Sequence, residues 1–213
     1  MQVKSIQHQQ AEELLNILTH GIGLLMSLVA LVVLVVYAVL EGTAWHVVSF
    51  AIYGSSLVVL YFASTIFHLS TNEKVRARLK VFDHASIFLL IAGTYTPFTL
   101  VTLRGPLGWS IFGVIWGLAI AGILLKLFYT GRFNVLSTIL YVLMGWMIIF
   151  AIYPLAEVFS FNGLLWLVAG GISYTIGAII FLFNNIPFNH TIFHVFVILG
   201  SLCHFVSVFW YVL

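Results

Sequence analysis

The sequence predicts an all-α membrane protein in which seven helices cross the bilayer as a bundle. Of its 213 residues, 62% are hydrophobic and only 7% are charged, whereas soluble domains average roughly 25% charged residues. So few charges cannot solvate the surface of a soluble domain of this length. The mean hydropathy of +1.16 agrees with this reading. Apolar runs of about 20 residues, the length that a helix needs to cross hydrocarbon, recur along the whole chain.

Seven apolar segments are separated by short polar breaks. We predict spans at about residues 14–40, 45–68, 82–103, 107–127, 133–153, 161–183 and 190–213. The breaks fall at residues 41–42, in a basic loop at 69–81, at 104–106, at 130–132, near Pro154 and at 184–187. A polar segment, residues 1–13, precedes the first span. No internal repeat is visible, so residues 1–213 are expected to form one domain.

Glycine and proline positions predict local packing of the spans. Gly113 and Gly117 form a GxxxG motif, which permits close approach of two helices in a membrane. Gly170 and Gly171 are expected to do the same in the sixth span. Pro97 should kink the third span, because proline cannot continue the helical hydrogen-bond ladder.

Lysine and arginine residues predict which end of the bundle faces the cytoplasm. Of the eight basic residues, seven belong to the N-terminal segment and the second, fourth and sixth loops, counting Lys126 at the end of the fourth span. Arg104 alone belongs to the opposite side. Because basic loops stay in the cytoplasm, the N-terminus is predicted to be cytoplasmic. After seven crossings the C-terminus is then outside.

Polar residues from four spans are predicted to meet in one layer near the cytoplasmic interface. They are Asn16, Thr19 and His20 of the first span, Ser64 and His68 of the second, Asp83 and His84 of the third, and His190 and His194 of the seventh. Ionisable groups at membrane depth are rare and usually face a bundle interior or a wet cavity. The layer is therefore the predicted functional site.

Three histidines of this layer have the pattern of a metal site. His190 and His194 are four residues apart, so both project from one face of a helix and can reach one ion. The alternative is hydrogen bonding between helices. His68 supplies a third imidazole at matching depth. Three protein ligands with an open fourth position are typical of catalytic zinc.

Ser64 and Asp83 are the candidate catalytic residues. Ser64 lies one turn before His68 and is interpreted as a hydroxyl that orients a ligand or water. A nucleophile paired with His68, or a serine bonded to its own helix carbonyl, are the alternatives. Asp83 fits two roles equally well, the N-terminal cap of the third span and a general base toward a water activated by a metal.

The remaining histidines are expected to be less central. His84 points about 100° away from Asp83 around the helix, so it either supports the candidate ligands from behind or lies at the membrane interface, and the interface is favoured. His204 lies about 15 Å deeper than His194 and is expected to bond another span. His20, with Asn16 and Thr19, either lines the same cavity as the three candidate ligands or packs the first span.

Four segments resemble a known family. They are NILTHG at 16–21, STIFH at 64–68, DHASIFLLIAGTYTPF at 83–98 and HTIFHVF at 190–196. They resemble the bacterial hemolysin III family, a branch of the progestin and adipoQ receptor superfamily, and the resemblance covers essentially the whole chain. The wider group, which includes adiponectin receptors and alkaline ceramidases, has been proposed to consist of metal-dependent membrane hydrolases.

The resemblance implies roles for specific residues. The Zn²⁺ ligands of the family correspond to His68, His190 and His194, with Asp83 beside the metal and Ser64 four residues before the first ligand. It also implies a multi-pass protein of the bacterial plasma (inner) membrane. Membrane lipids are then the environment and the expected substrate or ligand. The net charge of +2 gives no reason to expect a nucleic-acid partner, and the oligomeric state is left open.

Three functions are consistent with these residues. The first is a zinc-dependent hydrolase of the amidase or ceramidase kind, which acts on a lipid amide or ester at the cytoplasmic side. The second is a pore-forming cytolysin (hemolysin), which rests on the family name and would need polar groups along a path through the whole membrane. The third is a seven-helix sensor of membrane lipid or energetic state, in which the metal is a structural clamp.

Overall fold

The computed structural model describes residues 6–130, 134–183 and 185–213, and these residues are almost entirely helical. Residues 1–5, Arg132 and Asn184, which the predictions of orientation and of the sixth loop used, lie outside the described residues. The helices are α1 (Ile6–Glu41), α2 (Ala44–Leu69), α3 (Glu73–Pro97), α4 (Pro106–Tyr129), α5 (Asn134–Gly145), α6 (Ile152–Val158), α7 (Phe161–Leu182) and α8 (Asn189–Tyr211). A π-helical turn, η1 (Phe98–Thr102), follows α3, and a 3₁₀ helix, η2 (Trp146–Ala151), joins α5 to α6.

The prediction of seven membrane spans is confirmed. Seven helical segments of the described chain are long and apolar enough to cross a bilayer, and the fifth of them combines α5, η2 and α6. Many large apolar side chains on the outside of the bundle are exposed, such as Val29, Val32 and Leu40 of α1. An exposed apolar belt of this kind is suited to lipid rather than to water.

The third span begins earlier than predicted. The basic segment 69–81 was expected to be a loop, but α3 starts at Glu73, and the Asn72 side chain caps it by accepting hydrogen bonds from the amides of Lys74 and Val75. Basic residues continue the helix beyond its apolar part, because lysine and arginine are good helix formers. Asp83 therefore lies well inside α3, and its interpretation as the cap of this helix is wrong.

The fifth span ends later than predicted. A break was expected near Pro154, but the helix runs on to Val158, and α7 begins after Ser160, which caps it by accepting a hydrogen bond from the Gly163 amide. Pro154 stands in the first turn of α6, where the missing amide proton is not needed. Pro97 was expected to kink the third span, and the α-helix gives way to the π-helical turn η1 directly after it.

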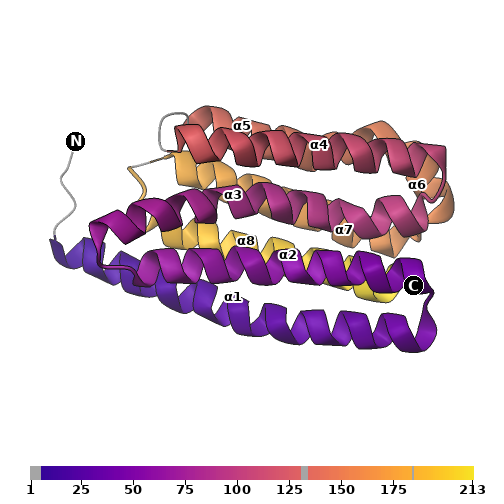
Figure 1. The fold of residues 1–213 in the computed structure, drawn as a ribbon, viewed down its shortest axis with the longest axis horizontal. Coiled ribbons are helices and arrows are strands. Elements are labelled where there is room, and N and C mark those ends of the chain that lie inside the picture. Colours follow the sequence, from indigo (N-terminus) through magenta and orange to yellow (C-terminus); the bar gives the residue numbers. More distant parts are fainter. Residues whose placement is uncertain (1–5, 131–133, 184) are drawn as a thin grey trace.

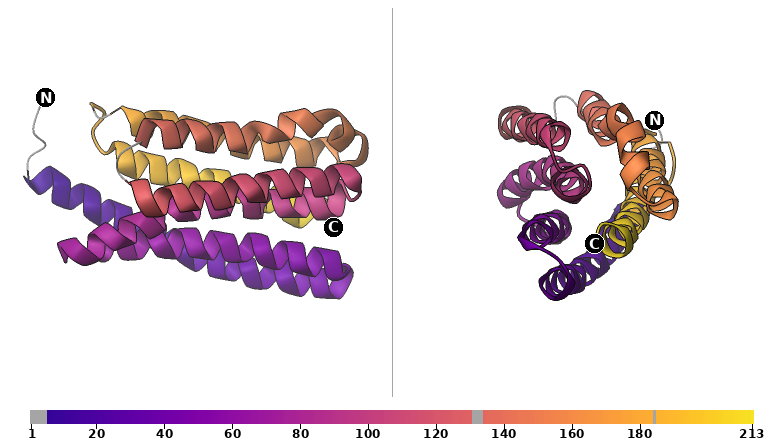
Figure 2. Two further views of the ribbon diagram at one scale, coloured as in Figure 1. Left: turned by 45° about the horizontal axis from the view of Figure 1, so that its top comes forward. Right: turned by 90° about the vertical axis from the view of Figure 1, so that its right-hand side faces the viewer.

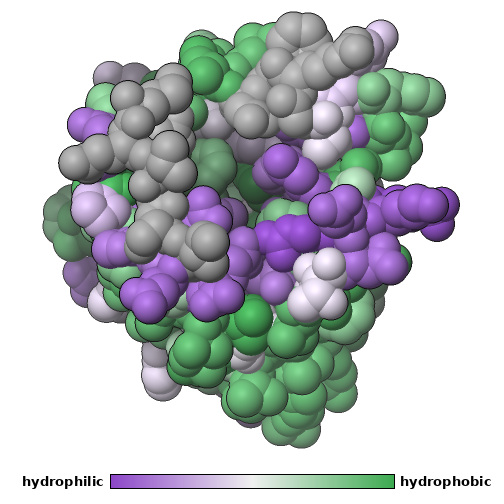
Figure 3. All heavy atoms as spheres, turned by 90° about the vertical axis from the view of Figure 1, so that its left-hand side faces the viewer, coloured by the Kyte–Doolittle hydropathy of each residue, from purple (hydrophilic) through white to green (hydrophobic). Residues whose placement is uncertain are grey.

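The helices run roughly along one common axis (Figure 1). The start of α1, the α2–α3 turn and the start of α8 lie at one end, here named the amino-terminal end, and the C-terminus lies at the other. Viewed along the axis, the helices form a curved arrangement in which α1 packs on α2 and α8, and α7 on α8 (Figure 2). Hydrophilic side chains gather across the amino-terminal end, with hydrophobic ones around them (Figure 3).

Close helix contacts occur at different glycines from those of the GxxxG motif. No atom lies within 4 Å of a Cβ built on Gly113 or on Gly117, so within the described chain this motif makes no close contact. Gly108 instead packs on the Thr99 and Leu103 carbonyl oxygens, and Gly170 packs on the ring of His204 as expected. A side chain at Gly108 would collide with backbone that has no room to move.

Candidate metal centre

The structure brings together the three histidines that the sequence singled out. His68 comes from the last turn of α2, and His190 and His194 come from the first two turns of α8. One ligand nitrogen from each lies within 4.8 Å of the other two. The centroids of the His190 and His194 rings are 4.6 Å apart, and the His68 ring lies 4.9 and 5.1 Å from them. This group could hold one metal ion.

Glu13 of α1 fixes the orientation of His68. The Nδ1 atom of His68 lies 2.7 Å from Glu13 Oε2, and since a carboxylate only accepts, Nδ1 carries the proton. The other oxygen of Glu13 binds Arg76 Nη2 at 2.5 Å. The other ring nitrogen, His68 Nε2, is buried and without a hydrogen-bond partner in the described part of the chain. Carboxylate-bound histidines of this kind are typical metal ligands.

Thr19 orients His194 in a similar way. Its hydroxyl donates to the Leu15 carbonyl at 2.8 Å, so that the hydroxyl oxygen accepts from His194 Nδ1 at 3.2 Å. Nε2 of His194 is thereby directed away from α1. His20 stacks on the same ring, with centroids 3.4 Å apart and planes tilted by 10°. Residues of α1 therefore set both the tautomer and the ring orientation of His194.

The start of α8 is also fixed by α1. Phe188, the residue before α8, has a left-handed conformation with φ of 55°, which is costly for a bulky residue. Thr191 donates to Asn16 Oδ1 at 2.7 Å, and the His190 amide points at Glu12 Oε1 at 3.4 Å. These contacts hold the first turn of α8, and hence His190 and His194, against α1.

Ser64 and Asp83 lie beside the three histidines. The Ser64 hydroxyl is hydrogen-bonded to His20 Nδ1 at 2.6 Å, so it reaches across to α1. The carboxyl group of Asp83 lies close enough to His68 and Ser64 to interact electrostatically with both. Ser64, Asp83 and His20 all line the same cavity as His190 and His194. This is the polar cluster from four spans that the sequence predicted.

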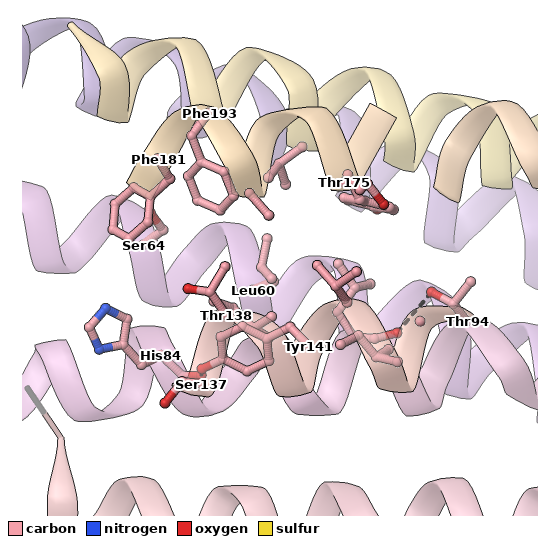
Figure 4. A pocket seen from close by; sticks show the side chains of 18 of the residues that line it. Leu60, Ser64, His84, Thr94, Ser137, Thr138, Tyr141, Thr175, Phe181 and Phe193 are labelled. Atoms are coloured by element: carbon pink, nitrogen blue, oxygen red, sulfur yellow. Dashed lines mark hydrogen bonds between the residues drawn. The ribbon is translucent and has the colours of Figure 1, made fainter. Parts of the chain in front are cut away.

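An internal cavity extends from this cluster into the bundle. The space open to the centre of a water molecule is about 160 Å³. Apolar side chains such as Leu60, Ile91 and Val197 form much of its wall. Tyr174 and His204 line the part of the cavity that is farther from the three candidate ligands. Figure 4 shows His84 and Ser137 near one end and Thr94 and Thr175 toward the other. The lining is therefore mostly apolar, with polar side chains where the cavity meets His190 and His194.

The other predicted histidines have mixed outcomes. His84 was expected at the membrane interface, but it lines the cavity, and its Nδ1 atom is buried without a partner among the described residues. Because α3 begins at Glu73, about nine residues before the predicted start of this span, His84 lies within the helix rather than in its first turn. His204 is bonded to another span as expected, since its Nε2 lies 3.0 Å from the Leu167 carbonyl oxygen of α7.

Sequence reasoning missed Glu12 and Glu13, which it assigned to a polar tail. A signal that this segment is helical was available. Glu13, Asn16 and His20 are spaced as on one face of a helix, and Gly23 and Ser27, which are buried, continue the same face. A polar stripe that continues a buried face indicates a helix that extends beyond the membrane and lines a site. The role of His20 was left open, and the structure places it on the cavity.

Comparison with known proteins agrees with this architecture. The family described as Haemolysin-III related matches residues 8–205. The chain is 50% identical over 202 residues to "Hemolysin-3" of Bacillus cereus, which covers 95% of this chain and 92% of that protein. It is 46% identical over 200 residues to "Hemolysin-3 homolog" of Bacillus subtilis (strain 168), covering 94% of each.

A more distant likeness reaches animal proteins. The human "Monocyte to macrophage differentiation factor" is 29% identical over 181 residues, which covers 81% of this chain and 74% of the human protein. The matched residues 8–205 include every residue of the cluster described above. With seven spans and bacterial relatives of nearly equal length, the protein is a multi-pass bacterial membrane protein. The chain belongs to the haemolysin-III-related family.

Proposed function

We propose that this protein hydrolyses an amide or ester bond of a membrane lipid and that Zn²⁺ is its cofactor. The observation that carries the proposal is the buried Nε2 atom of His68, which has no hydrogen-bond partner among the described residues and belongs to a group of three imidazoles beside a largely apolar cavity. A buried nitrogen acceptor without a partner is costly, and a cation would satisfy it. Imidazole suits zinc as well as copper, iron and nickel, and three histidines with an open fourth position are the pattern of catalytic zinc.

Asp83 and Ser64 supply the remaining chemistry. A bound Zn²⁺ would polarise the lipid carbonyl and make a nearby water more acidic. Asp83 takes a proton from the attacking water as its oxygen bonds to the carbonyl carbon. The same proton then passes to the leaving amine or alcohol, so that the acyl group departs as a carboxylic acid. Ser64, held by His20 at 2.6 Å, orients the water or the carbonyl oxygen.

The site is proposed to face the inner leaflet. Lys74, Arg76, Arg78 and Lys80 of α3 lie at the amino-terminal end, together with the cluster of histidines. Basic segments remain on the cytoplasmic side, so this end is assigned to the cytoplasm and the C-terminus to the outside. A reporter fused after Leu213 is expected to be active only if it requires export. Activity of a reporter that requires the cytoplasm would contradict this orientation.

Turnover by the purified protein tests the enzymatic proposal. In nanodiscs, the zinc-loaded protein is expected to release fatty acid from an amide-linked or an ester-linked lipid. Release should stop after a chelator strips the metal and return when Zn²⁺ is restored. Mass spectrometry of released acyl chains gives the measurement. Metal-loaded protein that releases no acyl chain from either class would contradict hydrolysis and leave the metal as a structural clamp between α2 and α8.

A further inference from the structure

Lys126 is a buried cation that the proposed chemistry does not use. It stands in the last turn of α4, yet only 4% of its surface is exposed. Its apolar neighbours Leu125 and Leu127 are 43% and 57% exposed. Lysines near the ends of membrane helices usually extend toward water. Here the arrangement is reversed, since the leucines point outward and the lysine points into the bundle.

Among the described residues, Lys126 has one hydroxyl partner and no counter-ion. Lys126 Nζ donates to Ser137 Oγ at 2.5 Å and lies 6.0 Å from the centre of the Tyr141 ring. The titratable groups that interact electrostatically with Lys126 are Lys80 and His84. Among the described residues, no carboxylate lies within ion-pair distance of Nζ. A charge removed from water in this way is costly unless an anion accompanies it.

A second unsatisfied group lies next to this lysine. Nδ1 of His84 is buried and has no hydrogen-bond partner in the described part of the chain. Lys126, His84, Ser137 and Thr138 all line the cavity, and Figure 4 shows His84 close to Ser137 at one end of it. An ammonium group and an imidazole that line one space, with the Ser137 hydroxyl beside them, are suited to an anion.

From this we infer that Lys126, His84 and Ser137 form a subsite for an anionic group, a phosphate or a carboxylate, carried by the lipid that occupies the cavity. The inference rests on the proposed function in taking the cavity as the substrate site, and it restricts the substrate to anionic lipids. The histidine cluster comes from α2 and α8, whereas the subsite comes from α3, α4 and α5. A lipid headgroup between these two walls would meet both, with its chain among the apolar side chains beyond them.

Ether-linked lipids separate binding from turnover, because they contain no bond that the proposed reaction cleaves. The probes are an alkyl glycerol phosphate and the alkyl glycerol with the same chain, titrated against the purified protein in neutral detergent. The Lys126→Gln variant is expected to bind the phosphate lipid at least tenfold more weakly and the neutral lipid unchanged. Lys126→Arg should remain within a few fold of wild type. Lys74→Gln, on the exposed surface of α3, is the matched control and should change neither.

Other results would overturn the subsite. Equal weakening of both lipids in Lys126→Gln, or no weakening of either, would show that Lys126 does not select an anion. Inorganic phosphate that binds as tightly as the phosphate lipid, and depends on Lys126, would assign the site to a free anion instead. Metal content and thermal unfolding show whether the helix bundle of Lys126→Gln is intact. If it is not, the Lys126→Arg variant still allows the test. Absence of lipid hydrolysis would leave this binding difference in place.

Discussion

Replacing His190 with alanine is expected to abolish stoichiometric zinc binding. The protein as purified should hold close to one Zn²⁺ per chain, and the variant should lose at least ~100-fold in affinity, more than the 10–100-fold typical of a lost supporting residue. The reason is that His68 and His194 alone offer two imidazoles to an ion that takes at least three protein ligands in catalytic sites. Elemental analysis after dialysis against a weak chelator gives the ratio of zinc to protein.

The same loss is expected for His68→Ala and His194→Ala. His46→Ala serves as the control, because His46 lies at the opposite end of the bundle, where its ring forms a hydrogen bond with Thr43. Thermal unfolding in detergent shows whether each variant still folds. Zinc that stays at one per chain in all three cluster variants would remove the metal centre, and with it the proposed hydrolysis.

Replacing Asp83 with asparagine is expected to stop turnover while zinc remains bound. Asparagine has nearly the same shape as aspartate but cannot accept a proton, and general-base catalysis contributes roughly 10²–10⁴-fold to rates. Acyl release should therefore fall by about that factor at saturating lipid. The ratio of zinc to protein should stay near that of the wild type, because Asp83 is not among the three grouped ligands.

A carboxylate elsewhere provides the comparison for Asp83. Glu157→Gln makes the same chemical change at an exposed position of α6, at the end of the bundle opposite the cluster. This variant should leave turnover unaltered. An Asp83→Asn protein that holds zinc and releases acyl chains at the wild-type rate would exclude Asp83 as the base. If it lost zinc as well, Asp83 would be a ligand rather than a base.

Much of the site could be predicted because its signals are local. The pair His190 and His194 is visible as a spacing within one helix, and the depth of His68 follows from where its span ends. The count of spans follows from hydropathy alone, since the hydrocarbon layer fixes the length of an apolar helix. These features depend on short stretches of sequence and on the dimensions of the bilayer.

The parts that were missed depend on contacts between helices. Glu13 meets His68 across 55 positions of sequence, and no local pattern ties one to the other. The start of α3 was misplaced because hydropathy locates the end of the apolar layer, whereas this helix continues past it as far as the Asn72 cap. That single boundary decided the wrong cap role of Asp83 and the wrong place of His84.

The Glu13 contact also defines what must be kept when the protein is shortened. A version trimmed to its lipid-embedded part, beginning at Leu14, would retain every imidazole of the cluster and lose both Glu12 and Glu13. His68 would then be free to rotate or to take the other tautomer, and Arg76 would lose its anionic partner. The minimal unit that keeps the Glu13–His68 contact therefore begins before Leu14, and affinity tags are better fused after Leu213 than joined to the first turns of α1.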